Sequence, residues 1–543
     1  MARRTRRGRS GPPGTIPRAA STPLRSGPRP ARRPPAARPW EVHHDQGKAL
    51  RDSVSRSAHG RWQAPPDRPD PLDLIARSNE GRLPGLIPIR MGRMATSLFG
   101  FYRGNAAVMA WDLAHTPVTG IHVLMDGDAH LANFGLFGTV ERDVVFDLND
   151  FDESQTGPWE WDLKRLVASV NVAAREFEWS RRDRAEAVRS CVQGYRGAVR
   201  RLEESGALAI WYEFLFTRRR NPGLHLDPVT HAVLWGAAET AAQRSNDTLL
   251  NRLAHRGPKG EWRFREIPPV QVRVPRDVRG QVLASLGAYA RTLPRGRRFL
   301  LDRYHPVDVA EHIVGVGSVG ARAYVVLLFG NGEDDPLLLQ VKEGLGPAAT
   351  PYLPPLPKDL AREPGKRVVT AQMALQSSPD LLLGWTRMDG HSFYVRQMRN
   401  LKGSVPLEEL TRKQFLRYVE ACGQVLGHAH ARTGDAARIA GYCGRSSALD
   451  DALARFAEEY GAQVERDHAR LVRAVASGHI AAVFEDAAAS PRRRSSAPGR
   501  GSVRSTSRPS GGPRAARRRP TSPPGSRRGR AARPPRSRSP GTN

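Results

Sequence analysis

The chain has 543 residues and a formal net charge of +31, from 85 Lys and Arg against 54 Asp and Glu. Its three cysteines, Cys191, Cys422 and Cys443, are too few and too scattered for a disulfide framework or a zinc site, and they fit a reducing cytoplasm. No apolar run reaches membrane-spanning length, so we expect a cytoplasmic protein without a membrane partner.

The two ends of the chain carry most of the charge. Residues 1–40 contain 11 Arg and residues 491–543 contain 16 Arg, and neither segment contains an acid. Both consist mainly of Arg, Pro, Ser, Gly and Ala, so they cannot bury enough apolar surface to offset their ordering entropy. We therefore expect disordered tails over residues 1–68 and 487–543. Such tails either attract nucleic acid nonspecifically or are solvated without a function. A tail without a function at the C-terminal end is also what an extended reading frame in GC-rich DNA would yield.

Residues 69–300 are expected to contain a catalytic loop followed by helices of a large lobe. Strand-like residues 120–125 lead into a loop with Asp128 and, five residues later, Asn133; a second strand at 143–147 precedes Asp150. A phosphotransferase uses such groups to orient a hydroxyl and to hold Mg²⁺, which prefers oxygen ligands. The same residue types also form ordinary turns between strands, so this motif alone leaves both interpretations open. Apolar spacing predicts the helices at 162–174, 185–204 and 229–253.

Residues 301–402 are expected to form a small lobe around a glycine pattern. The pattern is a Gly-x-Gly-x-x-Gly sequence formed by Gly315, Gly317 and Gly320, and it includes Ser318. A dinucleotide-binding fold would open a helix directly after these glycines, whereas residues 321–329 are β-prone. A turn and a strand ending in Lys342 follow, which is typical of the hairpin that covers ATP in a kinase. The alternative is a solvated lysine at the end of a strand.

The order of these segments differs from that of an ordinary kinase. The region after the lysine continues the kinase order, with a predicted helix at 367–376, strands at 381–386 and 392–398, and a helix at 415–430. The last helix lies within a return segment at 403–486. The catalytic loop, however, precedes the glycine pattern instead of following it. We therefore predict an α+β, two-lobed protein-kinase-like fold with a circularly permuted lobe order, flanked by the disordered tails. Permutation is tolerated where termini and loops lie near one another on the surface.

The sequence between residues 87 and 479 resembles the bacterial family called domain of unknown function 2252. The matching segments are residues 88–94, 101–104, 127–135, 149–153, 157–166, 340–343 and 394–397. A more distant similarity is to the aminoglycoside and choline kinases. Those kinases have a Gly-Asp-x-His-x-x-Asn pattern, which corresponds to residues 127–133. They also have a later Asp-Phe, corresponding to residues 150–151, and an Asp-Leu twelve residues beyond the metal-binding Asp, corresponding to residues 162–163.

The similarity to these kinases implies ATP and Mg²⁺ as cofactors and a role for each matching residue. Asp128 would be the catalytic base and His130 would stabilise the loop, while Asp162 would support the structure. Asn133 and Asp150 would be the metal ligands, although Asp147 and Asp152 lie close enough that Asp150 is chosen by analogy. The ATP-binding residues would be Gly315, Gly317, Ser318, Gly320 and Lys342.

One departure concerns the acid that a kinase pairs with this lysine. Such an acid is normally a helix Glu, but residues 369–372 offer Thr370 and Gln372, and Glu343 should point to the opposite face of its strand. The sequence thus predicts phosphoryl transfer from Mg-ATP to an unidentified hydroxyl-bearing substrate. The alternative is a weakly active or inactive nucleotide-binding protein, or adenylyl transfer, with tails that attract nucleic acid. The basic residues 90–103 either bind phosphate or an acidic substrate or cover apolar surface with their arginines.

Overall fold

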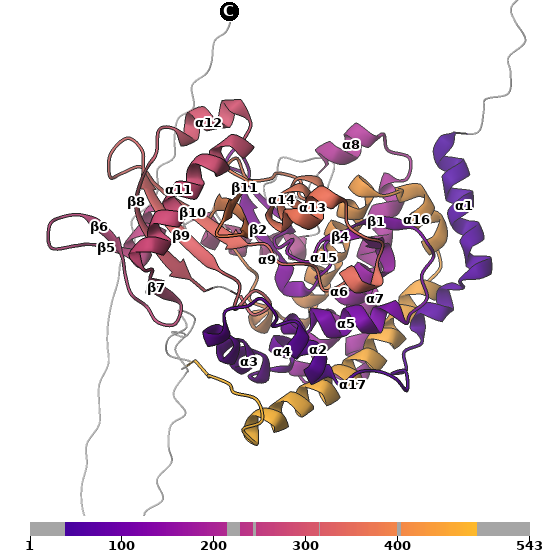
Figure 1. Cartoon of the computed structure of the whole chain (residues 1–543). Coiled ribbons are helices and arrows are strands. Elements are labelled where there is room, and N and C mark those ends of the chain that lie inside the picture. Colours follow the sequence, from indigo (N-terminus) through magenta and orange to yellow (C-terminus); the bar gives the residue numbers. More distant parts are fainter. Residues whose placement is uncertain (1–37, 214–227, 243–245, 314, 399–402, 486–543) are drawn as a thin grey trace, which may run out of the picture. The chain divides into compact units, whose positions relative to one another are not determined.

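The computed structural model describes residues 38–213, 228–242, 246–313, 315–398 and 403–485 (Figure 1). Over these residues the protein is a mixture of helices and antiparallel strands, which confirms an α+β class. No helix in this part of the chain is long and apolar enough to cross a membrane. The predictions of disorder for residues 1–37 and 487–543 lie outside the described residues.

Helices begin earlier in the chain than we predicted. Helix α1 (Pro39–Ser53) packs against α16 (Ala436–Cys443), and a Cβ atom at Gly47 would lie only 1.9 Å from the carbonyl oxygen of Arg438. The predicted tail at 1–68 is therefore wrong from residue 38 onward, because Gly47 permits a close helix contact that composition alone does not reveal. The helices that follow are α2 (Pro71–Arg77), α3 (Ile87–Ala95), α4 (Leu98–Gly104) and α5 (Ala106–Ala114).

Two small antiparallel sheets carry the loops that hold the predicted catalytic residues. Strand β1 (His122–Met125) pairs with β4 (Gln155–Pro158), and β2 (Phe134–Gly138) pairs with β3 (Val144–Leu148). The strands that we predicted at 120–125 and 143–147 are thus present as β1 and β3. Because β4 returns alongside β1, the loop after β1 and the loop after β3 lie side by side, with the backbone of Gly127 against that of Glu153.

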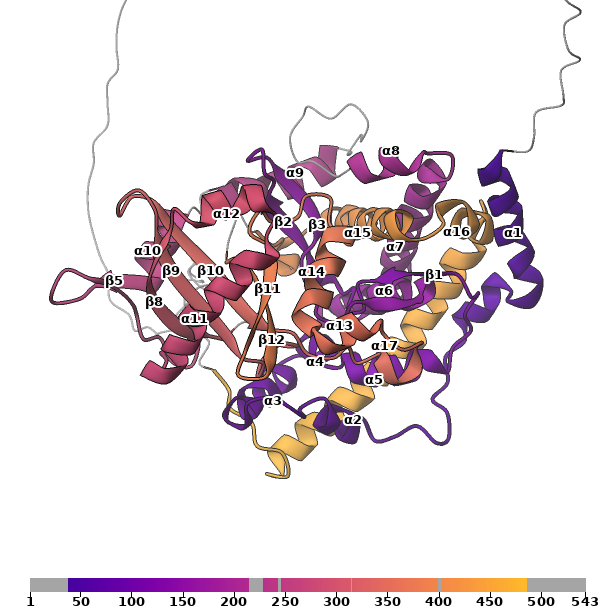
Figure 2. The same ribbon diagram turned by 45° about the horizontal axis from the view of Figure 1, so that its top comes forward.

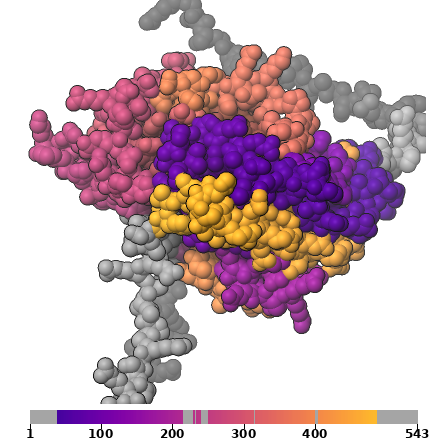
Figure 3. Space-filling model, turned by 60° about the horizontal axis from the view of Figure 1, so that its bottom comes forward, coloured from indigo at the N-terminus to yellow at the C-terminus, as the bar shows by residue number. Residues whose placement is uncertain are grey.

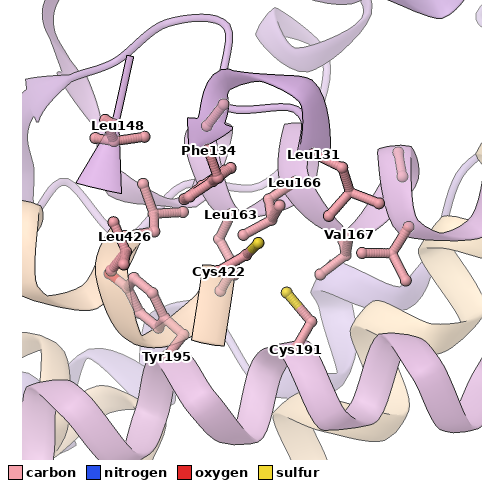
Figure 4. Close-up of a cluster of buried hydrophobic side chains, with 14 of the residues drawn as sticks. Leu131, Phe134, Leu148, Leu163, Leu166, Val167, Cys191, Tyr195, Cys422 and Leu426 are labelled. Atoms are coloured by element: carbon pink, nitrogen blue, oxygen red, sulfur yellow. The ribbon is translucent and has the colours of Figure 1, made fainter. Parts of the chain in front are cut away.

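A group of long helices encloses the largest hydrophobic core. The predicted helices at 162–174, 185–204 and 415–430 correspond to α6 (Trp159–Glu176), α7 (Arg181–Leu202) and α15 (Arg412–Thr433). Figure 4 shows Leu163 and Leu166 of α6 packed with Cys191 of α7 and Cys422 of α15. All three cysteines are buried and unpaired. The other helices of this part are α8 (Ala207–Tyr212), α9 (Pro228–Ala242) and α17 (Ala448–Ala476).

A six-stranded antiparallel sheet has the order β11-β12-β10-β9-β8-β7. Alternate residues of β9 enter two different cores, since Val326 packs with Tyr289 of α11 on one face and Leu327 packs with Leu250 of α10 on the other. The predicted strands around 321–329, 337–342, 381–386 and 392–398 correspond to β9 to β12. The strand bounds are β7 (Gln271–Arg273), β8 (His305–His312), β9 (Ala323–Phe329), β10 (Pro336–Glu343), β11 (Gly384–Met388) and β12 (His391–Gln397).

The segment before residue 301 differs from the helical large-lobe segment that we predicted. Strand β7 joins the six-stranded sheet, and α10 and α11 pack on its two faces, so these elements belong with the sheet and not with the long helices (Figure 2). Its strands escaped prediction because each has three residues, too few for a periodic pattern. The segment contains α10 (Asn246–Leu253), β5 (Ala254–Arg256), β6 (Trp262–Phe264), β7, α11 (Arg276–Thr292) and α12 (Arg295–Leu301).

Two further contacts bring distant parts of the chain together. Helix α14 (Pro364–Leu375), which follows α13 (Lys358–Arg362), packs against β12 and α15 and so links the sheet to the long helices. Helix α17 lies beside α2, α3 and α4, with the N-terminal helices in indigo next to it in yellow in Figure 3. The segment after α17 continues along α3, where the backbone N–H of Val483 donates to the carbonyl oxygen of Pro88 at 2.8 Å.

Candidate functional site

One cleft gathers most of the residues that the sequence singled out in two distant segments, although Gly320 and Lys342 do not line it. It is lined by Asp128, His130 and Asn133 from the loop after β1, by Asp150 from the loop after β3, and by the turn at residues 315–318. Its space is about 790 Å³, including the part open to solvent.

Asp162, in the first turn of α6, holds the loop that carries Asp128. Its two carboxylate oxygens accept the backbone N–H groups of Asp126 at 2.7 Å and Gly127 at 2.9 Å. The buried imidazole of His430, from α15, lies 3.2 Å from the same carboxylate. Gly127 has a φ of +81°, and a Cβ atom there would lie 2.0 Å from the carbonyl oxygen of Glu153, so only glycine fits. The loop is thereby fixed from both sides.

Asp128 is held by a buried arginine that the sequence analysis did not find. The guanidinium group of Arg165, on α6, lies 2.7 Å from Asp128 Oδ1, and His130 Nε2 lies 3.5 Å from Asp128 Oδ2. Burial raises the pKa of Asp128 to about 7, although Arg165 opposes the shift. Burial and the guanidinium groups of Arg103 and Arg165 lower the pKa of His130 well below its ordinary value. A carboxylate that titrates near neutrality beside a neutral imidazole is suited to accept a proton.

The structure distinguishes the three neighbouring aspartates from one another. Asp147 is buried and accepts hydrogen bonds from the backbone N–H and the hydroxyl of Ser377, at 2.8 and 2.7 Å, so its carboxylate is committed to the fold. Asp150 and Asp152 both line the cleft, together with Asn133, whose amide donates to the carbonyl oxygen of Asp128 at 2.8 Å. The position that was chosen by analogy, Asp150, therefore does face the cleft, and Asp152 accompanies it.

Lys342 is a buried lysine with two acidic partners. Its side chain is 3% exposed on β10; its ammonium group pairs with Asp152 and lies 3.8 Å from Asp150 Oδ1. Burial would lower the pKa of Lys342, but the carboxylates of Asp150 and Asp152 raise it well above its ordinary value. The interpretation as a solvated strand-end lysine is thus wrong. Glu343 instead binds Arg322 and His391, away from Lys342.

Helix α14 offers an arginine, and no acid, to this part of the cleft. Arg367 is buried and donates to the backbone carbonyl oxygens of Asp152 at 2.5 Å and Ser154 at 2.6 Å. It thereby positions the loop after β3, while Lys342 binds the carboxylates of that loop. The acid that pairs with Lys342 is therefore Asp152, which lies in the loop after β3 and not on α14.

The glycine turn (residues 315–320) is held by the N-terminal helices. Arg93 of α3 donates to the carbonyl oxygen of Gly315 at 2.5 Å, and Arg82 donates to that of Val319 at 2.8 Å. The backbone N–H of Leu83 donates to the carbonyl oxygen of Gly320 at 2.7 Å. The turn is thus attached to residues 82–93, a contact that sequence spacing gave no signal for.

Comparison with known families agrees with the resemblance noted from the sequence. The family described as "Uncharacterized protein conserved in bacteria (DUF2252)" matches residues 82–474. The chain belongs to the DUF2252 family. No curated protein and no solved structure matches it.

The DUF2252 match includes every cleft residue described above and all three segments that meet there. Sequence reasoning missed Arg165, Arg367 and Arg82 as members of the site. It named Asp152 as an alternative to Asp150 for the metal ligand, but not as the partner of Lys342. The spacing gives no signal for the arginines, because each meets the site through a contact between distant parts of the chain.

Proposed function

We propose that this member of the DUF2252 family is a kinase-like phosphotransferase that uses Mg-ATP and acts on a hydroxyl-bearing substrate. The observation that carries the proposal is the contact of Lys342 with Asp150 and Asp152, two residues that line the same cleft as Asp128 and the glycine turn. A lysine on the third strand of a glycine hairpin, facing an Asp that follows a strand, is the arrangement by which kinases bind Mg-ATP.

The chemistry of the cleft residues fits both cofactors. Asn133 and Asp150 offer oxygen ligands, and Mg²⁺ is usually held by one or two carboxylates together with substrate phosphates and water. In keeping with this, the described residues contain no group of three or more His, Cys, Asp or Glu that could hold a metal by themselves. Bound Mg²⁺ would neutralise phosphate charge, and Lys342 would contact the α- and β-phosphates once released from Asp152.

The order of the sheet elements supports the circular permutation that is part of this proposal. The glycine turn connects β8 to β9, Lys342 lies on β10, and α14, β11, β12 and α15 follow. This is the order of a kinase small lobe and the helix after it. The segment with Asp128 and Asp150 precedes β8 in the chain and yet lines the same cleft as the glycine turn.

A second candidate function is nucleotide binding with little or no phosphoryl transfer, or transfer of the adenylyl group. Two contacts favour it. Arg165 occupies one oxygen of Asp128, the proposed base, and α14 presents Arg367 where a kinase has its Glu. Both features reduce the similarity to an active kinase without removing the groups that would hold the nucleotide and the metal.

The first prediction separates the roles of two aspartates. In the full-length protein, Asp128→Asn should leave Mg-ATP affinity nearly unchanged and reduce turnover by about 10²–10⁴-fold, because a general base acts on the acceptor and not on the nucleotide. Asp150→Asn should weaken Mg-ATP binding about tenfold or more, because a proposed metal ligand is lost. Calorimetric titration with Mg-ATP gives the affinities, and ADP release during a screen of hydroxyl compounds gives the turnover.

A further comparison uses Lys342→Met, with Lys366→Met as its matched control. Lys366 is a lysine of α14 whose ammonium group pairs with Asp359 away from the cleft, so its loss should change neither binding nor turnover. Lys342→Met should weaken ATP binding. Equal loss of ATP binding in Asp128→Asn and Asp150→Asn would assign Asp128 to the metal or the fold. Full activity in both variants would exclude the phosphotransferase, and ATP binding by the wild type without ADP release would favour the second candidate.

A further inference from the structure

Arginines form a basic part of the cleft wall that the proposed roles leave unused. Arg82, Arg90 and Arg103 line the cleft with Asp128 and the glycine turn. They come from residues 82–104, which precede the first predicted catalytic residue in the chain. The question is what negative charge these arginines face.

Arg90 is the most buried of these arginines. Its side chain on α3 is 2% exposed and donates to Asn79 Oδ1 at 2.6 Å and to the carbonyl oxygen of Gly104 at 2.8 Å. Its Nε–H group has no hydrogen-bond partner, and it forms no ion pair with any residue that the structure describes. Burial and the neighbouring Arg82 lower the pKa of Arg90 to about 9. A buried charge without a counterion is costly, so a ligand anion would stabilise it.

Arg82 lies where the same wall meets the glycine turn. It donates to the carbonyl oxygens of Ser78 and Val319, both at 2.8 Å, and forms no ion pair within the described part of the chain. Burial lowers the pKa of Arg82, and the carboxylates that face it are Glu153, Asp152 and Glu343.

Those facing carboxylates have other partners. Asp152 binds Lys342, Glu343 binds Arg322 and His391, and Glu153 accepts the backbone N–H of Ala348 at 2.5 Å. None of these carboxylates forms an ion pair with Arg82 or Arg90 in the described part of the chain, and their charges offset only part of the cost of burying the two guanidinium groups.

We propose that Arg82 and Arg90 form a phosphate-binding site in this cleft. Guanidinium groups bind phosphate oxygens with paired hydrogen bonds, and Arg82 lies against the turn that would cover the nucleotide phosphates. The inference deepens the proposed function, and it rests on that function for the identity of the nucleotide. The phosphoryl group belongs either to the nucleotide, as its terminal phosphate, or to a phosphorylated acceptor.

The test uses the full-length protein and inorganic pyrophosphate, which carries phosphate chemistry without adenosine. Calorimetric titration should show pyrophosphate binding by the wild type and a loss of about tenfold or more in Arg82→Gln, equivalent to about 1.4 kcal/mol. Arg82→Lys, which keeps the charge, should lose less. Arg77→Gln is the matched control, because Arg77 is an exposed arginine of α2 that does not line the cleft. Its pyrophosphate affinity should stay within twofold of the wild type, about the precision of such comparisons.

A second arm identifies the source of the phosphate. If the site takes the terminal phosphate, Arg82→Gln should weaken ATP binding more than ADP binding, and ATP should displace pyrophosphate. If the site takes an acceptor phosphate, inorganic phosphate should still bind to protein saturated with ADP and Mg²⁺, and Arg82→Gln should abolish that binding. Either result supports the site.

The outcomes also separate this site from the proposed function. Pyrophosphate binding that depends on Arg82 in a protein that does not bind ATP would retain the phosphate site and end the kinase proposal. If the wild type turns over ATP, and Arg82→Gln leaves the affinities for pyrophosphate and phosphate unchanged, the phosphate site is overturned but the kinase proposal is not. Thermal unfolding of each variant shows whether it is folded; if Arg82→Gln is not, the comparison of Arg82→Lys with the wild type decides.

Discussion

Buried arginines of this protein fix contacts between distant segments through ion pairs. Arg68 is 7% exposed and lies 2.7 Å from both Asp112 of α5 and Asp467 of α17, which are themselves buried. Tyr460 donates to the same Asp112 at 2.9 Å. Removing one member of such a group leaves an uncompensated buried charge, which typically costs about 3–5 kcal/mol. Single residues thus determine how the N-terminal segment meets the last helix.

The second prediction concerns His59, which is buried beside Tyr442. The Tyr442 hydroxyl donates to the carbonyl oxygen of Val54 at 2.9 Å, so it accepts the His59 Nε2–H group at 2.7 Å. His59 Nδ1 has no partner among the described residues, and protonation there would bury an unsatisfied N–H group. Burial and Lys164 lower the pKa of His59 from 6.5 to about 3. The pKa of His59 is thus lower in the folded protein than in the unfolded protein. Neutral His59 therefore contributes fully to the free energy of unfolding above pH 6.5, and this contribution is lost as the pH falls toward 3.

The measurement compares the unfolding free energies of the wild type and His59→Gln at pH 7 and pH 5. Glutamine does not titrate, so the cost of the substitution should shrink by about 2 kcal/mol between these pH values. Buried carboxylates such as Asp112, whose pKa burial raises, change stability in the opposite direction, but they are common to both proteins and cancel. A cost of substitution that is the same at both pH values would mean that His59 is protonated without penalty in the folded state.

Among the described helices, α7 and α15 make the most extensive contact, and glycines permit it. A Cβ atom at Gly194 of α7 would lie 2.1 Å from the carbonyl oxygen of Glu420, and one at Gly423 of α15 would lie 2.0 Å from that of Cys191. The obstructing atoms are backbone atoms, which cannot rotate away. The two helices also carry Cys191 and Cys422 into the core that contains Leu131 and Phe134 (Figure 4).

The third prediction uses two glycines of the same helix. Gly194→Ala should destabilise the protein by about 1–3 kcal/mol, because the α7 and α15 backbones must move apart. Gly197→Ala should be neutral or stabilise by up to about 1 kcal/mol, since nothing lies within 4 Å of its added Cβ atom and alanine favours helix. Denaturant unfolding monitored by circular dichroism gives both values. If Gly194→Ala is as harmless as Gly197→Ala, the close contact of the two helices is not a feature of the folded protein.

Elements with a long periodic pattern could be predicted, and elements made by a contact could not. Helices α6, α7 and α15 repeat their apolar residues over several turns, and β9 and β10 are apolar runs bounded by turns. Strands β5 to β7 have three residues each; β5 and β6 pair only with one another, and β7 pairs with β8 of the six-stranded sheet. Helix α1 has one buried residue, Gly47, so its apolar pattern is weak and its position depends on α16.

The same distinction holds for the residues of the site. Asp128, Asn133 and Asp150 lie in two short loops, so their spacing predicted them and the cleft contains all three. The partner of Lys342 could not be predicted, because Asp152 reaches it only when the loop after β3 meets β10. Whether these residues carry the proposed roles stays a prediction for the variants to decide.

At the scale of the whole molecule, the segment after α17 returns to α3, beside the glycine turn. Helix α3 contacts the glycine turn through Arg93, and the same guanidinium group pairs with Glu485, after α17. A Cβ atom at Gly92 would lie 1.9 Å from the carbonyl oxygen of Val483, so the C-terminal segment lies directly on α3. Two segments far apart in the chain are thus held together beside the glycine turn.

The last prediction concerns the arginine-rich ends beyond these segments. Deleting residues 1–37 and 487–543 removes 10 and 16 arginines but no residue of the core or the cleft; the deletion stops at residue 37 because α1 packs on α16. Thermal stability and ATP affinity should therefore not change. Any affinity of the intact protein for DNA or RNA should disappear; before deletion it should fall by roughly 0.7–0.9 log units per contacted phosphate for each tenfold rise in salt. Nucleic-acid binding that survives the deletion would assign it instead to the basic residues 90–103, and unfolding on deletion would show that the ends are part of the fold.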